Sequence, residues 1–222
     1  MSALGPVAIV GGTGRLGMAL ARRLSRAEVQ VIIGSRDPAK AKSAAASLGA
    51  TARGLSNADA AAAGRVIVLS VPYAAHRVTV ESLAAGAAGK VVIDTAVPLV
   101  TGEVQHVDLP PAGSLALETA ALLPDAKVAA AFHTVSSAML NDLERPPHGD
   151  VLICADDMDA KEAAEGLVRA VGMRPVDAGG LSHSHALEHL AGLLLVVNRR
   201  YRRHDLGITI AGLEYKDYGI RG

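Results

Sequence analysis

Short apolar runs rich in Val and Ile recur along the chain, separated by longer stretches in which apolar and polar residues mix. Each run is bounded by glycine, proline or charged residues, which is typical of strands buried on both faces of a parallel sheet. The predicted strands are Val7–Val10, Val29–Ile33, Val66–Val71, Val91–Ile93, Val128–Phe132 and Val151–Cys154. The stretches between them are rich in Ala, Leu and Arg, and the predicted helices are Leu16–Arg26, Pro38–Leu48, Asn57–Ala62, Ala74–Ala85 and Gly113–Leu123.

This alternation of strand and helix predicts a Rossmann-type α/β fold, a doubly wound parallel sheet with right-handed crossovers. After Cys154 the pattern changes, and we expect a helix over Asp159–Val171, a short apolar stretch over Arg174–Val176 and a helix from Ser182 to about Arg202. The last helix is apolar over Leu193–Val197, where we expect burial, with a dimer contact or a substrate wall as alternatives.

The best boundary between two regions is the segment 146–149, because its two prolines and its glycine cannot continue a helix or a strand ladder. We therefore expect a Rossmann domain over residues 1–145 and a small C-terminal α/β appendage over residues 146–222. The appendage is expected to serve substrate binding and dimerisation, and the long apolar helix near Leu193–Val197 predicts a homodimer.

Composition narrows the classes of partner. Lys+Arg and Asp+Glu are equal at 22 each, so no overall charge would attract nucleic acid or an anionic membrane, and the expected partners are small molecules. A single cysteine, Cys154, excludes an intramolecular disulfide framework and fits a reducing compartment, so we expect a cytoplasmic location. The run Val7–Val10 is too short for a signal peptide or a membrane span.

The segment directly after the first strand, GGTGRLG, contains the pattern G-x-G-x-x-G at Gly12, Gly14 and Gly17. In a dinucleotide site the three glycines make the tight turn, let the backbone approach the pyrophosphate and let the helix pack close to the strand. An ordinary strand-to-helix turn is the alternative. The position between a clear strand and a clear helix favours a dinucleotide site, with the helix N-terminus holding the anion.

The end of the second strand favours NADP over NAD. Ser35 and Arg36 stand where a Rossmann domain meets the adenosine ribose, and Lys40 lies one helical turn further on. A hydroxyl and two cations suit a 2′-phosphate, whereas an NAD site offers a carboxylate to the ribose hydroxyls. Asp37, next to Arg36, leaves the NAD alternative open.

Later motifs make the resemblance of the chain more specific. They are VLSVPYAAH at the third predicted strand, the Val97-Pro98 step, AFHTVSS around His133, Cys154 to Asp157, and DAGGLSHS beginning at Asp177. With GGTGRLG and GSRDPAK, they make nearly the whole chain resemble the NADPH-dependent reductase family of coenzyme F420, an 8-hydroxy-5-deazaflavin. The resemblance implies an oxidoreductase that transfers a hydride between NADP(H) and coenzyme F420.

The resemblance also implies roles for individual residues. Pyrophosphate binding falls to Thr13, Gly14, Arg15 and Leu16, and 2′-phosphate binding to Ser35, Arg36 and Lys40. Ser70, Val71, Val97 and Ser137 are expected at the nicotinamide, together with the neighbouring Pro72, His76 and Pro98, while His133 and Ser182 are expected to face the deazaflavin. The carboxyl ends of strands, where several of these residues lie, are where open α/β sheets collect their ligands.

Departures from the family pattern fall on the presumed deazaflavin side, at Ser136, Ala155, Gly180, His183 and His185. Two alternatives therefore stay open: an NADPH-dependent reductase of another small acceptor, such as an imine or an enone, and a non-catalytic NADP(H) sensor.

Direct hydride transfer from nicotinamide C4 to deazaflavin C5 requires no protein acid or base, so the protein is expected mainly to align two cofactors. His133 is the one catalytic candidate, as a hydrogen-bonding group to the acceptor; capping of a strand end is an equal alternative. His183, His185 and His189 raise a metal hypothesis that no cysteine supports, and we expect no metal site. Asp156 and Asp157 are expected to cap the next helix, and Cys154 to be buried and inert.

Overall fold

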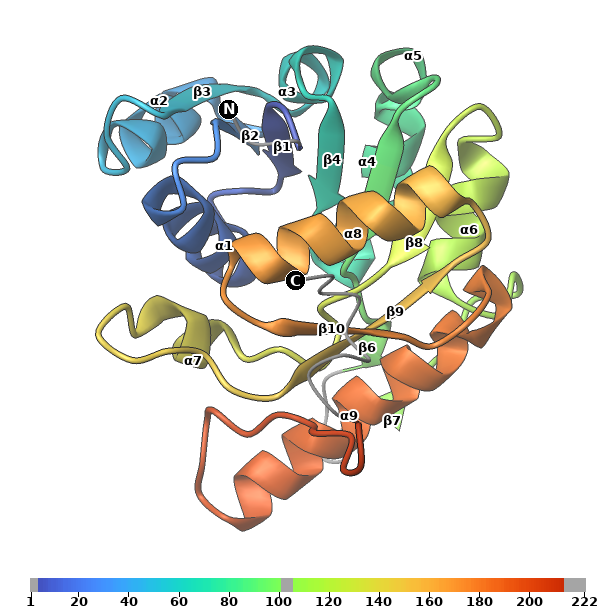
Figure 1. Cartoon of the computed structure of the whole chain (residues 1–222). Helices are drawn as coiled ribbons and strands as arrows, with labels where there is room; N and C mark the ends of the chain where they lie inside the picture. Colours follow the sequence, from blue (N-terminus) through green and yellow to red (C-terminus); the bar gives the residue numbers. More distant parts are fainter. Residues whose placement is uncertain (1–3, 101–105, 214–222) are drawn as a thin grey trace.

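The computed structural model describes residues 4–100 and 106–213, which form an eight-stranded sheet flanked by helices and a separate two-stranded ribbon (Figure 1). The strand order in the large sheet is β10-β9-β8-β5-β4-β1-β2-β3, a Rossmann-type arrangement. Its strands are β1 (Val7–Val10), β2 (Val31–Ser35), β3 (Ala52–Ser56), β4 (Val66–Leu69), β5 (Val91–Asp94), β8 (Lys127–Ala130), β9 (Asp150–Ala155) and β10 (Arg174–Asp177). The ribbon pairs β6 (Leu99–Val100) with β7 (His106–Val107).

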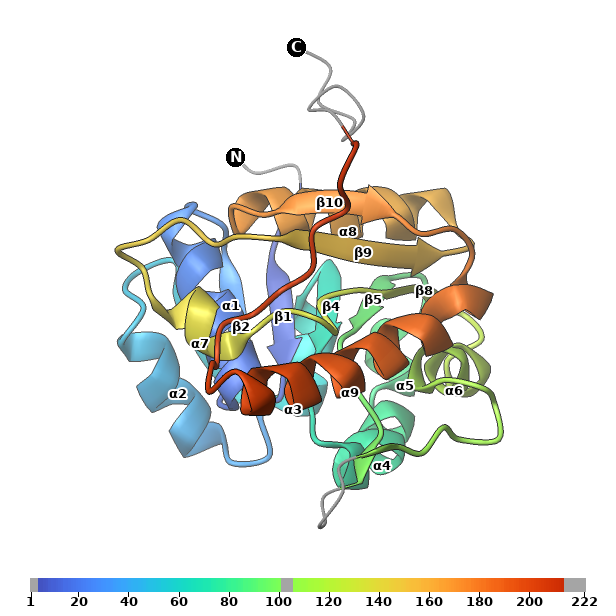
Figure 2. The same ribbon diagram turned by 90° about the horizontal axis from the view of Figure 1, so that it is seen from below.

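Helices cover both faces of the sheet (Figures 1 and 2). One face carries α1 (Arg15–Arg26), α2 (Pro38–Ala46) and α8 (Met158–Ala170). The other carries α3 (Asn57–Ala63), α4 (Tyr73–Ser82), α5 (Ala84–Ala87) and α6 (Leu115–Leu122). Three further helical segments, α7 (Ser137–Asn141), the 3-10 turn η1 (Leu181–His183) and α9 (Ser184–Arg200), complete the described chain.

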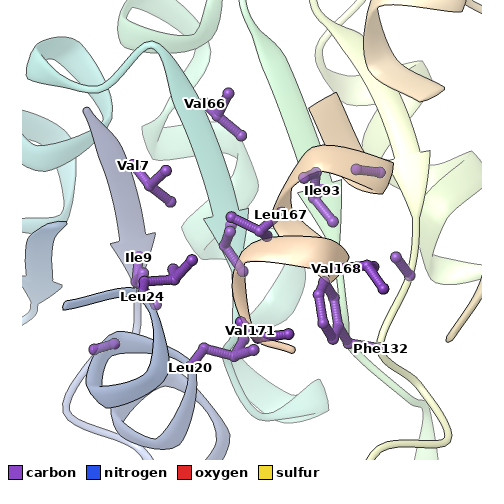
Figure 3. Packing of buried hydrophobic residues seen from close by; sticks show 14 of the residues in the cluster. Val7, Ile9, Leu20, Leu24, Val66, Ile93, Phe132, Leu167, Val168 and Val171 are labelled. Atoms are coloured by element: carbon purple, nitrogen blue, oxygen red, sulfur yellow. The ribbon is translucent and has the colours of Figure 1, made fainter. Parts of the chain in front are cut away.

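The central strands are apolar throughout because both of their faces are covered. All four residues of β1 have no exposed surface: Val7 and Ile9 pack on one side of the sheet, Ala8 and Val10 on the other. Figure 3 shows the first side, where side chains of α1 and α8 lie against β1, β4 and β5. Full burial of each such aliphatic side chain contributes about 1.5–3 kcal/mol, so this packing fixes the carboxyl ends of the strands that carry the site.

One expectation about strand direction is wrong. The strand predicted at Val151–Cys154 exists as β9, but it runs antiparallel to β8 rather than parallel to it. A parallel neighbour needs a crossover, usually a helix, that returns the chain to the other end of the sheet. The segment between β8 and β9 contains only the short α7, which packs against α1, and the chain re-enters the sheet from beyond the carboxyl end of β8.

The sheet continues across the predicted boundary near residue 146, because β9 and β10 extend the sheet that the first 130 residues begin. The small C-terminal α/β appendage is therefore built on the edge of the Rossmann sheet. The division into two separate folding units, residues 1–145 and 146–222, stays a prediction.

Helix α9 lies beyond the carboxyl ends of the strands and crosses the molecule from α6 to α7 (Figure 2). Its first turn is bound to the start of α6: the hydroxyls of Ser114 and Ser184 lie 2.7 Å apart, and the carboxylate of Glu188 accepts the N–H of Leu115 at 2.7 Å. Glu188 is completely buried, and burial raises its pKa to about 8. These contacts hold α9 over the sheet as the wall of a pocket.

Candidate functional site

Glycine is required at two points of the loop between β1 and α1. Gly11 has a φ of +75°, and a Cβ on it would lie 2.3 Å from the carbonyl oxygen of Ser70. A Cβ on Gly17 would lie 2.8 Å from the Cα of Gly12. The loop and the first turn of α1 are thus pressed against each other and against the end of β4, as the motif predicts. Gly11 lies directly before the motif and was not among the predicted site residues.

The N-terminus of α1 is open to an anion. The N-cap residue is Gly14, which makes no side-chain capping bond, and no acidic residue lies in the first turn of this described helix. Free N–H groups and the helix dipole at such an end favour a negative charge. Asn57 supports the loop by accepting the N–H of Gly11 on its side-chain oxygen at 3.2 Å.

A pocket of about 530 Å³ lies between this loop and the ends of β2 and β4. It collects loop backbone, the two cations after β2 and the residues after β4. Its lining residues are Gly11, Thr13, Gly14, Ser35, Arg36, Asp37, Lys40, Asn57, Ser70, Val71, Pro72, Ala75 and Thr79. We call it the loop pocket.

Within the loop pocket, Arg36 and Lys40 are exposed, and neither has an acidic partner among the described residues. Asp37 serves a different purpose, because one oxygen of its carboxylate accepts the N–H groups of Ala39 at 3.0 Å and Lys40 at 3.2 Å and caps α2. One oxygen of Asp37 is thus engaged in the helix cap, and the two exposed cations on either side of it favour a phosphate here.

A second pocket, of about 960 Å³, lies between the ends of β5 and β8 and helix α9. One wall is apolar, and the mouth is basic. Its lining residues are Arg15, Val97, Leu99, His133, Thr134, Val135, Ser136, Ser137, Ala138, Ala191, Leu194, Leu195, Asn198, Arg199, Arg202, Arg203, His204 and Leu206. We call it the α9 pocket. Gly14 lines the loop pocket and the next residue, Arg15, lines the α9 pocket, so the two pockets adjoin at the start of α1.

His133 is one of the polar groups that line the α9 pocket. It is nearly buried, and neither ring nitrogen has a hydrogen-bond partner within the described residues. Burial lowers its pKa to about 4, so the imidazole is neutral near pH 7. The preceding residue, Phe132, has a φ of +67°, a backbone conformation that costs a non-glycine residue about 1–3 kcal/mol. Both ring nitrogens also have almost no accessible surface, so the neutral imidazole would have to turn within the wall of the pocket to hydrogen-bond a ligand.

His76 does not stand where the sequence analysis expected it. It is completely buried and lines neither pocket; its Nε2 lies 2.9 Å from the carboxylate of Asp94. Burial opposes charge on both groups, yet their hydrogen bond raises the pKa of His76 and lowers that of Asp94. Thr119 donates to the same carboxylate at 2.7 Å, and the other carboxylate oxygen accepts the N–H of Ala96 at 2.8 Å. This network fixes the end of β5 just before Val97, which lines the α9 pocket. His76 therefore affects that pocket only by holding Val97 in position.

The remaining predicted site residues divide between the two pockets and their surroundings. Thr13, Gly14, Ser35, Arg36, Lys40, Ser70, Val71 and Pro72 line the loop pocket, and Arg15, Val97, His133 and Ser137 line the α9 pocket. Gly12, Leu16, Gly17, Pro98 and Ser182 line neither; the glycines and Leu16 pack the loop and the core.

Helix α9 was predicted as a helix, but most of the residues that it contributes to the site were not. Asn198, Arg199 and Arg202 line the α9 pocket, and so do Leu194 and Leu195, whereas Leu193 and Val196 are 58% and 49% exposed. Burial of the whole apolar run 193–197 was therefore the wrong expectation, and the substrate-wall alternative describes two of its residues. The available signal was the apolar run 193–197, which is followed after Asn198 by two pairs of arginines, at 199–200 and 202–203.

Other candidates have structural roles. Asp157 caps α8, accepting the N–H of Asp159 at 2.8 Å, and Cys154 is buried with its pKa raised to about 11 by burial. Among the described residues no group of three His, Cys, Asp or Glu side chains is arranged to hold a metal ion. Nor does the described part of the chain contain a helix long and apolar enough to cross a membrane.

The chain is similar to known proteins along nearly its whole length. The family model described as NADP oxidoreductase coenzyme F420-dependent matches residues 6–98, which include the loop pocket. The chain is 37% identical to the F420-dependent NADP reductase of Methanocaldococcus jannaschii, covering 94% of this chain and 99% of that protein. It is 38% identical to the F420-dependent NADP reductase of Methanothermobacter marburgensis, covering 93% of this chain and 98% of that protein.

A solved structure agrees at the level of the fold. The crystal structure of a protein from Arthrobacter sp. FB24, provisionally assigned as an F420-dependent NADP reductase, has a TM-score of 0.80 and 22% identity. The structural match covers 92% of this chain and 98% of the Arthrobacter chain. The end-to-end coverage of these proteins includes α9 and therefore both pockets.

Proposed function

The chain belongs to the family of F420-dependent NADP reductases, and we propose that it transfers a hydride between NADP(H), bound in the loop pocket, and coenzyme F420, bound in the α9 pocket. The observation that carries the proposal is the junction of the two pockets at Gly14 and Arg15. A hydride moves directly only between atoms held in contact, so adjoining pockets are what the reaction needs.

The residues of the loop pocket fit NADP(H). The open N-terminus of α1 suits the pyrophosphate, and Arg36 and Lys40 suit a 2′-phosphate. A Cβ built on Gly14 would lie 3.1 Å from the oxygen of Gly11, so a glycine here lets the loop fold closely at the start of α1. The helix cap gives Asp37 a structural role, which supports NADP over NAD.

NADP(H) supplies the hydride chemistry when bound, and the chain supplies alignment. Leu194 and Leu195 of α9, with Val97 and Leu99 after β5, form apolar walls suited to a flat ring system. His133 offers a neutral hydrogen-bonding group, which stabilises charge as it develops on the acceptor. We assign no proton transfer to any side chain.

The direct test is the visible absorbance of oxidised coenzyme F420 mixed with the purified protein and NADPH, with NADH in a parallel sample. The proposal expects rapid bleaching with NADPH and little with NADH. Binding of NADPH without bleaching would favour another acceptor, such as an imine or an enone. No binding of NADPH at all would contradict the assignment of the loop pocket.

We further propose a cytoplasmic homodimer. The lone Cys154 is consistent with a reducing compartment, and the outer face of α9 exposes Leu193 and Val196, an apolar surface that a second copy would cover. Light scattering at micromolar concentration tests the dimer; a monomeric mass would contradict it.

A further inference from the structure

Glu188 is a buried carboxyl group that the proposed hydride transfer does not use. Its side chain has no exposed surface. One oxygen accepts the N–H of Leu115 at 2.7 Å, and the other has no hydrogen-bond partner within the described residues. An ionised carboxylate with an unpaired oxygen is far more costly to bury than the neutral acid. The surroundings of Glu188 therefore favour its protonated form.

The groups around Glu188 act on its proton in both directions. The N–H groups of Leu115 and Ala116, at the start of α6, and the imidazole of His76 on α4 favour the ionised form. Burial and the carboxylate of Asp94 on β5 oppose it. Burial is the largest of these effects and raises the pKa of Glu188 to about 8, so the group is neutral at pH 7.

The other titratable groups on the helices and strands around α9 are engaged elsewhere. Glu118 of α6 lies 3.5 Å from Nδ1 of His76, and Cys154 of β9 is neutral because burial raises its pKa to about 11. Several histidines are exposed to solvent: His106 of β7, His183 of η1, and His185 and His189 of α9 itself. The proton on Glu188 is thus governed by burial, by Asp94 and by His76.

Glu188 is connected to the α9 pocket through one face of its own helix. Ala191, Leu195 and Asn198 follow it at positions i+3, i+7 and i+10, which lie on the same side of an α-helix. All three line the α9 pocket. The first turn of α9 is docked on α6, and the later turns form the wall, so the docking of Glu188 sets the position of that wall.

We propose that Glu188 is a positioning residue of the acceptor site, and that only its protonated form holds α9 where the acceptor binds. Loss of the proton would place a second negative charge near Asp94 in the interior. The start of α9 would then move away from α6, and the wall at Leu195 and Asn198 would move with it. The proton is exchanged with solvent and takes no part in the hydride transfer. This inference rests on the proposed function, since it concerns the binding of the acceptor.

The stability of the protein carries a signature of this proton. Glutamate in the unfolded chain ionises near about pH 4.3, whereas Glu188 in the folded chain keeps its proton up to about pH 8. Its contribution to stability is therefore fully present below about pH 4.3 and is lost progressively as the pH rises to about 8. Glu188→Gln keeps an oxygen for the N–H of Leu115 but cannot ionise. Its melting temperature should therefore rise relative to that of the wild type over this range and level off above it.

The experiment measures the KM for oxidised coenzyme F420, at saturating NADPH, between pH 7 and pH 9. Because the protonated fraction of Glu188 falls over this range, the wild-type KM should rise about tenfold, with little change in kcat or in the KM for NADPH. The KM of Glu188→Gln should stay flat. The matched control is His189→Gln, which removes an exposed titratable group from the adjacent position of α9 and should keep the rise.

Infrared spectroscopy reports the proton without any acceptor. At pH 7 the wild type should show the band of a protonated carboxyl group, and Glu188→Gln should lack it. A wild-type KM that is constant between pH 7 and pH 9 would overturn the inference and leave the proposed function intact. A rise that persists in Glu188→Gln, or an absent infrared band, would do the same. Failure of the wild type to reduce coenzyme F420 at every pH would instead contradict the proposed function, whereas the infrared band and the melting temperatures test Glu188 independently.

Discussion

The two pockets are built in different ways. The loop pocket combines the glycine-rich backbone between β1 and α1 with residues that follow β2, β3 and β4, all within the first 79 residues, and its shape depends on Gly11 and Gly17, where a Cβ would collide with backbone. The α9 pocket is made of side chains from the ends of β5 and β8, from α7 and from α9, which lie far apart in the sequence. The first tolerates almost no change in sequence at its loop, whereas the second can be altered one side chain at a time.

Of the five departures from the family pattern, only Ser136 lines the α9 pocket, and none lines the loop pocket. A backbone site for a phosphate serves any protein that binds the same dinucleotide, so its motif is widespread. A side-chain pocket adapts to the shape and charge of one acceptor. Substitutions in the two pockets should therefore affect the two substrates separately.

Gly11→Ala should break the loop pocket and spare the other. The new Cβ would be strained at a φ of +75° and would lie 2.3 Å from the oxygen of Ser70, so we expect destabilisation of roughly 3 kcal/mol and at least a hundredfold weaker NADPH binding. Calorimetric titration with NADPH measures the binding. Gly89→Ala is the control, because Gly89 has a φ of +70° but open space around it. Equal loss of binding in both variants would refute the role of the contact.

Asp94→Asn should loosen the floor of the α9 pocket through the end of β5. Removing one member of a buried charge pair costs about 3–5 kcal/mol. An asparagine keeps one oxygen for the N–H of Ala96 but places an NH₂ donor where the other carboxylate oxygen faces His76 and Thr119, and this mismatch should shift the end of β5. The raised pKa of His76 contributes stability that is present below about pH 6.5 and lost as the pH rises through the folded-state pKa. The lowered pKa of Asp94 contributes stability that is present above about pH 3.9 and lost at lower pH.

Denaturant unfolding of the wild type and of Asp94→Asn at several pH values tests these two pH dependences of stability. The difference in free energy of unfolding should be largest between about pH 4 and pH 6.5 and should shrink on both sides. A difference that is constant with pH would show that the network is not ionised.

His133→Leu should slow hydride transfer and leave NADPH binding unchanged. Loss of a hydrogen bond to the charge that develops on the acceptor should lower kcat about 10- to 100-fold. Because the pKa of His133 is near 4, wild-type kcat should show no ionisation of this group between pH 5.5 and 8. His133→Gln, which keeps a donor and an acceptor, should recover part of the rate. Normal kcat in His133→Leu would favour a purely structural role at the strand end.

Arg36→Gln combined with Lys40→Gln should change the choice of dinucleotide without damaging the pocket. Loss of both exposed cations should raise the KM for NADPH about 10- to 30-fold and leave the KM for NADH nearly unchanged. Steady-state kinetics with both dinucleotides measure the effect, and Lys42→Gln, on the same helix but outside the pocket, is the control. A parallel loss with NADH would contradict the 2′-phosphate role.

Local signals allowed much of the fold and the loop pocket to be predicted. The strand β1, the glycines and the pair Arg36 and Lys40 lie within one βαβ unit, so their contacts follow from their spacing. The edge strand β3 was missed because its residues Ala52–Ser56 include a glycine and an arginine and are only partly buried. The direction of β9 was missed because it depends on a connection rather than on the strand's own residues.

The α9 pocket could not be assembled from the sequence for a similar reason. Leu194 and Leu195 show the same apolar pattern as core residues, and only the docking of Glu188 and Ser184 against the start of α6 decides which face of α9 is left for a ligand. That docking joins residues about 70 positions apart, as the pair Ser114 and Ser184 shows. His133 was found through its motif, but its lack of a partner became visible only in three dimensions.

The central claim is that the two pockets serve one direct hydride transfer. It is tested most directly with NADPH that carries deuterium at one or the other face of nicotinamide C4, in separate samples, mixed with oxidised coenzyme F420 in ordinary water. Mass spectrometry of the reduced deazaflavin should find the deuterium in the product from one of the two samples. Reduced product that contains only hydrogen from water in both samples would contradict direct transfer between adjoining sites.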